Sequence, residues 1–273
     1  MSACDAHFHV FGPEERYAYS SDLRYQPPHA PLEDYLSHAA ELGIGRYVLV
    51  QPSAYGRDNR CMLDAMRALG KDKCRGIVDI DESTPQAELE QLHDAGVRGV
   101  RINVNPIKPP EPGFSSGMLK TIHALDEKCA RLGWMLDFLT PGWLTRELIP
   151  VLRDLRSPFS VAHFGMFPAM GGPQQSSFVA FLSLVRGCER CWVKLTGAYR
   201  ISLDPGFADT VPLARAVIAA APDRVLWGSD YPHLSFADKV NSHRLFQLLQ
   251  EWAPDERIRN KILVENPERC FGF

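Results

Sequence analysis

Two histidines stand two residues apart near the start of the chain, in the stretch Asp5-Ala-His-Phe-His9. Side chains two residues apart on a β-strand project to the same face, so His7 and His9 would point together into one pocket. Imidazoles there can ligate a metal, transfer protons or donate hydrogen bonds to a developing oxyanion. The pattern is short and also fits a surface pair or a core histidine, so other polar residues decide its meaning.

The best partner for the two histidines is Asp230, in the stretch Trp227-Gly-Ser-Asp-Tyr-Pro-His233. This apolar run delivers a single carboxylate, while Gly228 allows close approach of the backbone and Pro232 ends the strand. We expect Asp230 at the mouth of the pocket. The alternative is an aspartate that caps the next helix.

The elements that must position these side chains alternate regularly along the chain. Strand-like apolar runs occupy residues 4–10, 46–51, 75–80, 97–103, 134–139, 159–164, 191–195 and 224–229. Segments of helical period lie at 32–42, 59–69, 86–95, 117–132, 144–155, 178–186 and 207–220. Eight βα units in 273 residues predict a single (β/α)8 TIM barrel domain over residues 1–273. No Gly-x-Gly-x-x-Gly follows the first strand, which argues against a dinucleotide-binding fold.

The active site of such a barrel lies at the carboxyl ends of its strands, which makes polar residues there candidates. Arg98 and Arg101 are three apart on one strand and so face opposite ways; Arg101, nearer the carboxyl end, is the inward candidate. A buried guanidinium needs an anion, which is either the substrate or a structural carboxylate. His163 and Arg200 also follow strands, although a core histidine and a surface arginine are the alternatives.

Composition limits the classes of partner. The net charge is −3 and the pI about 6.3, so no basic field indicates nucleic acid or an anionic membrane; a small molecule is the expected partner. Seven scattered cysteines, with a lone Cys188-x-x-Cys191, suggest neither a disulfide framework nor a zinc module. With no leader and no membrane span, we expect a cytoplasmic protein; its oligomeric state stays open.

Several stretches carry a resemblance that spans the chain, at residues 5–12, 50–59, 96–103, 227–233, 265–269 and 271–273. Together with His7-x-His9 and Asp230, they resemble the amidohydrolase superfamily, in the branch of 2-pyrone-4,6-dicarboxylate lactonase and related sugar lactonases. The resemblance implies a hydrolase that opens a small anionic lactone. It makes Asp230 the base that activates water, and His7, His9 and His163 the groups that polarise the ring carbonyl.

The resemblance also assigns substrate contacts. Arg101 and Arg200 match arginines that hold substrate carboxylates, and Ser53 and Tyr25 match further contacts, although turn chemistry also explains Ser53. Three positions depart from the pattern: Asn105-Pro-Ile-Lys108 replaces a second arginine, Asp137 stands near an expected tyrosine, and Met166 replaces an arginine. The substrate is therefore expected to differ from pyrone dicarboxylate itself.

We expect no metal and no other cofactor, because Arg101 stands where metal-dependent relatives have a ligand and a guanidinium repels a cation. The alternative is one zinc ion at His7, His9, His163 and Asp230, in a zinc-dependent hydrolase or decarboxylase. A lactone isomerase would share the metal-free site. From another class, a catalytically silent barrel that binds an anion is the remaining alternative.

Overall fold

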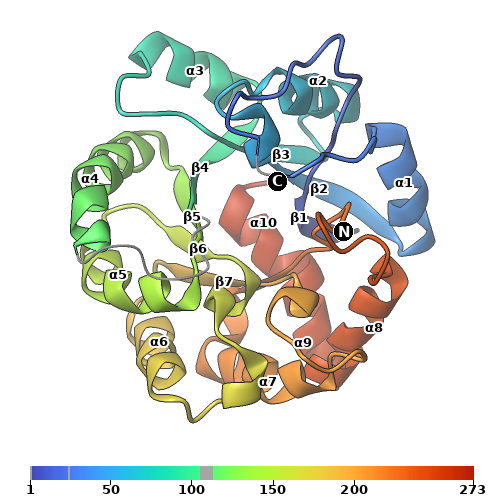
Figure 1. Ribbon diagram of the computed structural model, residues 1–273, viewed down its shortest axis with the longest axis vertical. Helices are drawn as coiled ribbons and strands as arrows, with labels where there is room; N and C mark the ends of the chain where they lie inside the picture. Colours follow the sequence, from blue (N-terminus) through green and yellow to red (C-terminus); the bar gives the residue numbers. More distant parts are fainter. Residues whose placement is uncertain (1, 24, 105–112) are drawn as a thin grey trace.

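A computed structural model describes residues 2–23, 25–104 and 113–273. Eight parallel strands form one sheet in the order β1 to β8, and Figure 1 shows them as a ring surrounded by helices. The strands are β1 (Ala3–Phe8), β2 (Ile44–Val50), β3 (Cys74–Val78), β4 (Val97–Asn103), β5 (Met135–Leu139), β6 (Phe159–Val161), β7 (Cys191–Leu195) and β8 (Val225–Trp227). The predicted single TIM barrel is confirmed.

A helix follows each strand. These helices are α1 (Leu32–Glu41), α2 (Arg60–Leu69), α3 (Gln86–Asp94), α4 (Phe114–Leu132), α5 (Gly142–Asp154), α6 (Ser176–Gly187), α7 (Val211–Ala220) and α8 (Ser242–Trp252), with α9 (Glu256–Asn260) and α10 (Asn266–Phe271) after them. The last three were not predicted. Helix α7 begins four residues later than expected, because Phe207 adopts a left-handed φ of 62° that a helix cannot contain. No helix in the described ranges has the length and apolar character to cross a bilayer.

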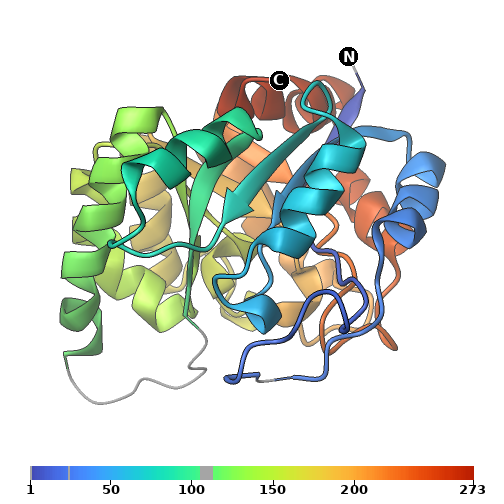
Figure 2. The ribbon, with the colours of Figure 1, turned by 90° about the horizontal axis from the view of Figure 1, so that it is seen from above.

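The interior of the barrel is a small apolar cluster separate from the larger core between strands and helices. Its members are Cys4, Ala6, Val48, Val50, Ile77, Met135, Trp192, Leu226 and Phe271. Phe271 belongs to α10, and the backbone carbonyl of this residue accepts a hydrogen bond from Arg75 of β3. Helix α10 therefore plugs the amino-terminal end of the barrel, and Figure 2 shows it on the side opposite the long loop after β1.

The first strand and the segment after the last strand close the ring through hydrogen bonds of the predicted site residues. The amide of Asp230 donates to the carbonyl of His7, and the amide of His9 donates to the carbonyl of Tyr231, each at 2.8 Å. Beneath them, the carboxylate of Asp5 accepts from the amides of His7 and Ser229, each at 3.0 Å. Closure of the barrel and assembly of the site thus depend on the same residues.

Gly228 lies at this junction, and a side chain there should disturb it. A Cβ atom would come within 2.7 Å of the Cβ and backbone nitrogen of His7, so Gly228→Ala should lower the free energy of unfolding by about 2 kcal/mol. Thermal unfolding measures this change. Gly117→Ala on α4 is the control, because nothing lies within 4 Å of its added Cβ; if both variants unfold alike, the packing argument is wrong.

Candidate active site

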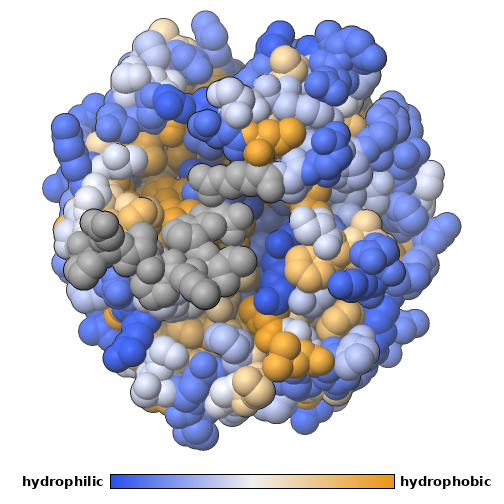
Figure 3. Space-filling view, viewed as in Figure 1, coloured by the Kyte–Doolittle hydropathy of each residue, from blue (hydrophilic) through white to orange (hydrophobic). Residues whose placement is uncertain are grey.

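A cavity of about 1020 Å³ opens at the carboxyl ends of the strands. In Figure 3, seen from the same side as Figure 1, a hollow with hydrophilic side chains is visible near the centre of this face. Seven of the eight side chains predicted for the site line the cavity: His9, Tyr25, Ser53, Arg101, His163, Arg200 and Asp230. The eighth, His7, is not among the lining residues and lies fully buried beside Asp230.

Asp230 is fully buried and has a left-handed φ of 56°, a conformation uncommon outside glycine and frequent at functional sites. Its Oδ2 accepts a hydrogen bond from Tyr199 Oη at 2.5 Å and one from Arg200 Nε at 2.8 Å. Burial alone would raise the pKa of Asp230, but the Arg200 guanidinium and the neighbouring histidines hold it well below its usual range. The carboxylate is therefore ionised at neutral pH.

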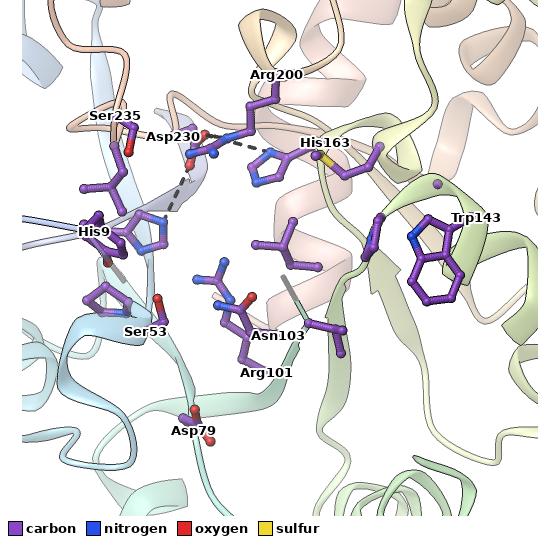
Figure 4. Close-up of a pocket in the computed structure, with 18 of the residues that line it drawn as sticks. His9, Ser53, Asp79, Arg101, Asn103, Trp143, His163, Arg200, Asp230 and Ser235 are labelled. Atoms are coloured by element: carbon purple, nitrogen blue, oxygen red, sulfur yellow. Dashed lines mark hydrogen bonds and ion pairs between the residues drawn. The ribbon is translucent and has the colours of Figure 1, made fainter. Parts of the chain in front are cut away.

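The three predicted histidines surround this carboxylate, as Figure 4 shows for His9 and His163. Nε2 of His7 and Nε2 of His9 lie 3.6 and 3.5 Å from Asp230 Oδ1, and Nδ1 of His163 lies 3.9 Å from Oδ2. Burial lowers the pKa of all three rings, that of His163 to about 3. At pH 7 the site thus holds three neutral imidazoles around one carboxylate.

A contact at Nδ1 orients the rings of His9 and His163. Nδ1 of His9 lies 2.7 Å from the carbonyl oxygen of Val50; because a carbonyl only accepts, Nδ1 carries the proton and Nε2 is an acceptor. Nδ1 of His163 lies 2.7 Å from Oγ1 of Thr196. Within the described residues, Nε2 of His163 has no hydrogen-bond partner, which leaves it available to a bound molecule.

Two arginines project into the cavity from different strand ends. Arg101 is buried on β4 and donates to the carbonyl of Gln51 at 2.9 Å, whereas Arg98 donates to the carbonyls of His93 and Val97 instead. The inward and outward assignment of the two side chains on β4 is thus as expected from their spacing. Figure 4 shows Arg101 across the cavity from Arg200.

Sequence reasoning gave no site role to several polar residues, among them Tyr199, Lys194 and Asp137. Tyr199, which bonds Asp230 directly, was passed over beside Arg200 in the turn after β7. Lys194 and Asp137 form an ion pair of 2.7 Å in which both side chains are fully buried. The signal for this pair was a lysine inside the apolar strand Cys-Trp-Val-Lys-Leu. The departures noted at residues 105–108 lie outside the described residues.

The amidohydrolase family model matches residues 4–273. The chain belongs to the amidohydrolase family. Among curated members it is 38% identical to 4-sulfomuconolactone hydrolase of Hydrogenophaga intermedia, over 98% of this chain and 88% of that protein. It is 33% identical to the 2-pyrone-4,6-dicarboxylate hydrolase of Comamonas testosteroni, over 98% and 90%. The resemblance to this branch of the family is thereby confirmed.

A solved structure of this branch superimposes over the whole chain. It is a probable 2-pyrone-4,6-dicarboxylic acid hydrolase from Acinetobacter baumannii with citric acid bound. The TM-score is 0.83 at 25% identity, and the match covers 100% of both chains. This amidohydrolase barrel therefore agrees with its relatives in fold as well as in sequence.

The predicted histidine and carboxylate cluster can be tested for a zinc ion. Ligand atoms of His7, His163 and Asp230 lie within 4.8 Å of one another, so their separation alone would accommodate one. However, a metal-bound histidine ordinarily donates its second ring N–H to a carboxylate or carbonyl, whereas Nδ1 of His7 faces the ammonium of Lys194 at 3.4 Å. Arg200 also already pairs with the carboxylate. His7, His9, His163 and Asp230 therefore do not together fit the ligand set of a zinc ion.

Proposed function

We propose that this amidohydrolase opens small anionic lactones by hydrolysis, with Asp230 as the base that activates water. The observation that carries the proposal is a buried, ionised carboxylate that lines a cavity together with Arg101, Arg200 and two neutral imidazoles. Ester hydrolysis needs such a base, and it needs donors where negative charge develops on the carbonyl oxygen. The names of the two curated relatives given above, both lactone hydrolases, support the same reaction class.

The geometry suggests a role for each imidazole. Oδ1 of Asp230 and the unprotonated Nε2 of His9 lie 3.5 Å apart. A water molecule beside them can donate one hydrogen bond to each. The water oxygen attacks the lactone carbonyl, the ring C–O bond breaks, and the proton taken by Asp230 passes to the ring oxygen. His163 can donate from Nε2 to the carbonyl oxygen when Nδ1 accepts from Thr196. His7, outside the cavity lining, acts through Asp230.

The two arginines favour an acid-bearing substrate, because a guanidinium pairs with a carboxylate or sulfonate through two parallel hydrogen bonds. Ser53 and Tyr25 line the same cavity and provide further contacts. A substrate anion that pairs with Arg200 competes with Asp230 for the guanidinium and so raises the pKa of the base on binding. The bound citric acid of the Acinetobacter relative supports a pocket suited to carboxylates.

We also propose that the reaction needs no metal, since three cations, Arg101, Arg200 and Lys194, already surround the Asp230 and Asp137 carboxylates. A divalent cation added to this buried cluster of charges would not have its charge neutralised.

All seven cysteines are free thiols, six of them buried. This is typical of a reducing compartment and supports a cytoplasmic location.

Loss of Arg200 should change the pH dependence of the reaction. Because Arg200 holds the pKa of Asp230 down, Arg200→Gln should raise that pKa and move the acid limb of kcat/KM to higher pH. The profile is measured on a neutral lactone, whose binding needs no arginine. Arg146→Gln, at another arginine of the cavity wall, should leave the limb in place. An unmoved limb in Arg200→Gln would contradict this role.

The deciding experiment is hydrolysis of a panel of lactones, with and without acid groups, followed by proton release before and after exhaustive chelation. Hydrolysis of acid-bearing lactones that survives chelation supports the proposal. Activity lost on chelation and restored by zinc would establish the zinc-dependent alternative. Consumption of lactone without proton release would indicate an isomerase. Binding of lactone without turnover would indicate a catalytically silent barrel that binds anions.

A further inference from the structure

His7 is neutral at pH 7 because burial and the nearby Lys194 lower its pKa, so its chemistry depends on which ring nitrogen holds the proton. The neighbour of the other nitrogen decides this. Nδ1 of His7 lies 3.4 Å from Nζ of Lys194, and an ammonium donates but cannot accept. We propose that Lys194 holds His7 in the tautomer with the proton on Nε2, which faces Asp230 Oδ1, and that Lys194 is thereby a positioning residue for the base.

The ammonium is held in place by a built arrangement inside the barrel. Lys194 projects from β7 and pairs with Asp137 of β5 at 2.7 Å, and both side chains are fully buried. The hydroxyl of Ser160, on β6 between these strands, donates to the same oxygen of Asp137. Burial alone would raise the pKa of Asp137, but Lys194 and Arg101 lower it overall. The pair is therefore charged, and Lys194 has a proton to give to His7.

His9 shows the opposite arrangement around the same carboxylate oxygen. Its Nδ1 faces the carbonyl of Val50, so its Nε2 is unprotonated. The two histidines of the His-x-His pair thus present different groups to Asp230 Oδ1: a donor at 3.6 Å from His7 and an acceptor at 3.5 Å from His9. An N–H on Nε2 of His7 points its positive end at Asp230 from beneath, whereas the acceptor of His9 can share the attacking water of the proposed reaction on the cavity side.

This assignment also explains why the cluster does not suit zinc. Nε2 of His7 would have to lose its proton to ligate, and the ring could then keep a proton only on Nδ1, against the ammonium of Lys194. The tautomer is independent of the reaction catalysed. Its expected effect on rate rests on the proposed lactonase function.

Nitrogen-15 NMR of histidine-labelled protein tests the assignment directly, because long-range spectra distinguish the two neutral tautomers. His7→Gln identifies the His7 signals by their loss. We expect wild-type His7 to carry its proton on Nε2 and His9 to carry its proton on Nδ1. A proton on Nδ1 of wild-type His7 would overturn the proposal without any variant and without any substrate.

The double variant Lys194→Met/Asp137→Leu removes both charges of the ion pair, a replacement that proteins often tolerate. It should give His7 a mixture of tautomers and lower kcat about 10-fold with KM within about 2-fold. It should also bind zinc more tightly than wild type does. Ser160→Ala, which removes a hydrogen bond to Asp137 but keeps the ion pair with Lys194, should retain the wild-type His7 signals. Unchanged His7 signals in the folded double variant would show that Lys194 does not set the tautomer. If wild type opens no lactone, the proposed function is wrong, but the NMR result still decides whether Lys194 sets the tautomer of His7.

Discussion

Replacement of Asp230 with asparagine should lower kcat on an acid-bearing lactone by about 10³-fold, the contribution expected of a positioned general base. The amide keeps the volume of the side chain but cannot take a proton from water. KM should stay the same or fall, because Arg200, which now pairs with Asp230 at 2.8 Å, becomes free for the substrate anion. Steady-state kinetics on one acid-bearing lactone separates the two constants.

The matched control is Asp22→Asn, at an exposed carboxylate of the cavity mouth. Its kcat should stay within about 2-fold of wild type, because a rim carboxylate takes no part in proton transfer. Circular dichroism of Asp230→Asn establishes that the barrel is intact. A folded Asp230→Asn enzyme with full activity on every lactone that wild type opens would remove Asp230 from the mechanism.

Loss of the Arg101 guanidinium should have the second largest effect, and it should depend on the charge of the substrate. Arg101→Gln should lower kcat/KM for acid-bearing lactones by about 10²-fold, since truncation of one partner of a buried, hydrogen-bonded charge pair costs about 2–5 kcal/mol. The loss should appear mainly in KM. Neutral lactones should be affected less than about 5-fold, because they leave no anion unpaired.

Arg98→Gln is the control on the same strand, because Arg98 bonds only backbone carbonyls among its described contacts. It should leave both substrate classes unchanged. Equal losses on charged and neutral lactones in Arg101→Gln would instead make Arg101 a structural partner of Asp137, whose charge already acts on it.

The barrel and the outer parts of the site could be predicted because each depends on local pattern. Alternating apolar runs and helical periods locate strand ends, and a polar residue at a strand end must face the cavity region, as Asp230 and Arg101 do. The contact between Lys194 and Asp137 could not be found in this way, since it depends on how far β5, β6 and β7 are shifted along one another. The position of Tyr199 depends on a turn that begins at Gly197, with a left-handed φ of 57°.

The depth of His7 was also beyond sequence reasoning. Alternation along a strand predicts that His7 and His9 share a face, and both do face Asp230. However, the pairing of β1 with β2 is irregular between Asp5 and Phe8, where the Asp5 carboxylate accepts from the His7 amide. Such an irregularity re-aims a side chain, and here it accompanies a His7 that lies below the cavity, outside the lining residues.

The hydrogen bonds that join His7 to Asp230 and His9 to Tyr231 connect opposite ends of the chain, and the nearby contact between Asp5 and Ser229 spans 224 residues. Contacts of such long range form late in folding, because the entropy of closing the intervening loop must first be offset. Helices and neighbouring strands can form earlier from local contacts. During refolding, recovery of catalysis should therefore lag behind recovery of helical circular dichroism, and enzymatic activity becomes a kinetic probe of the moment at which the ring closes.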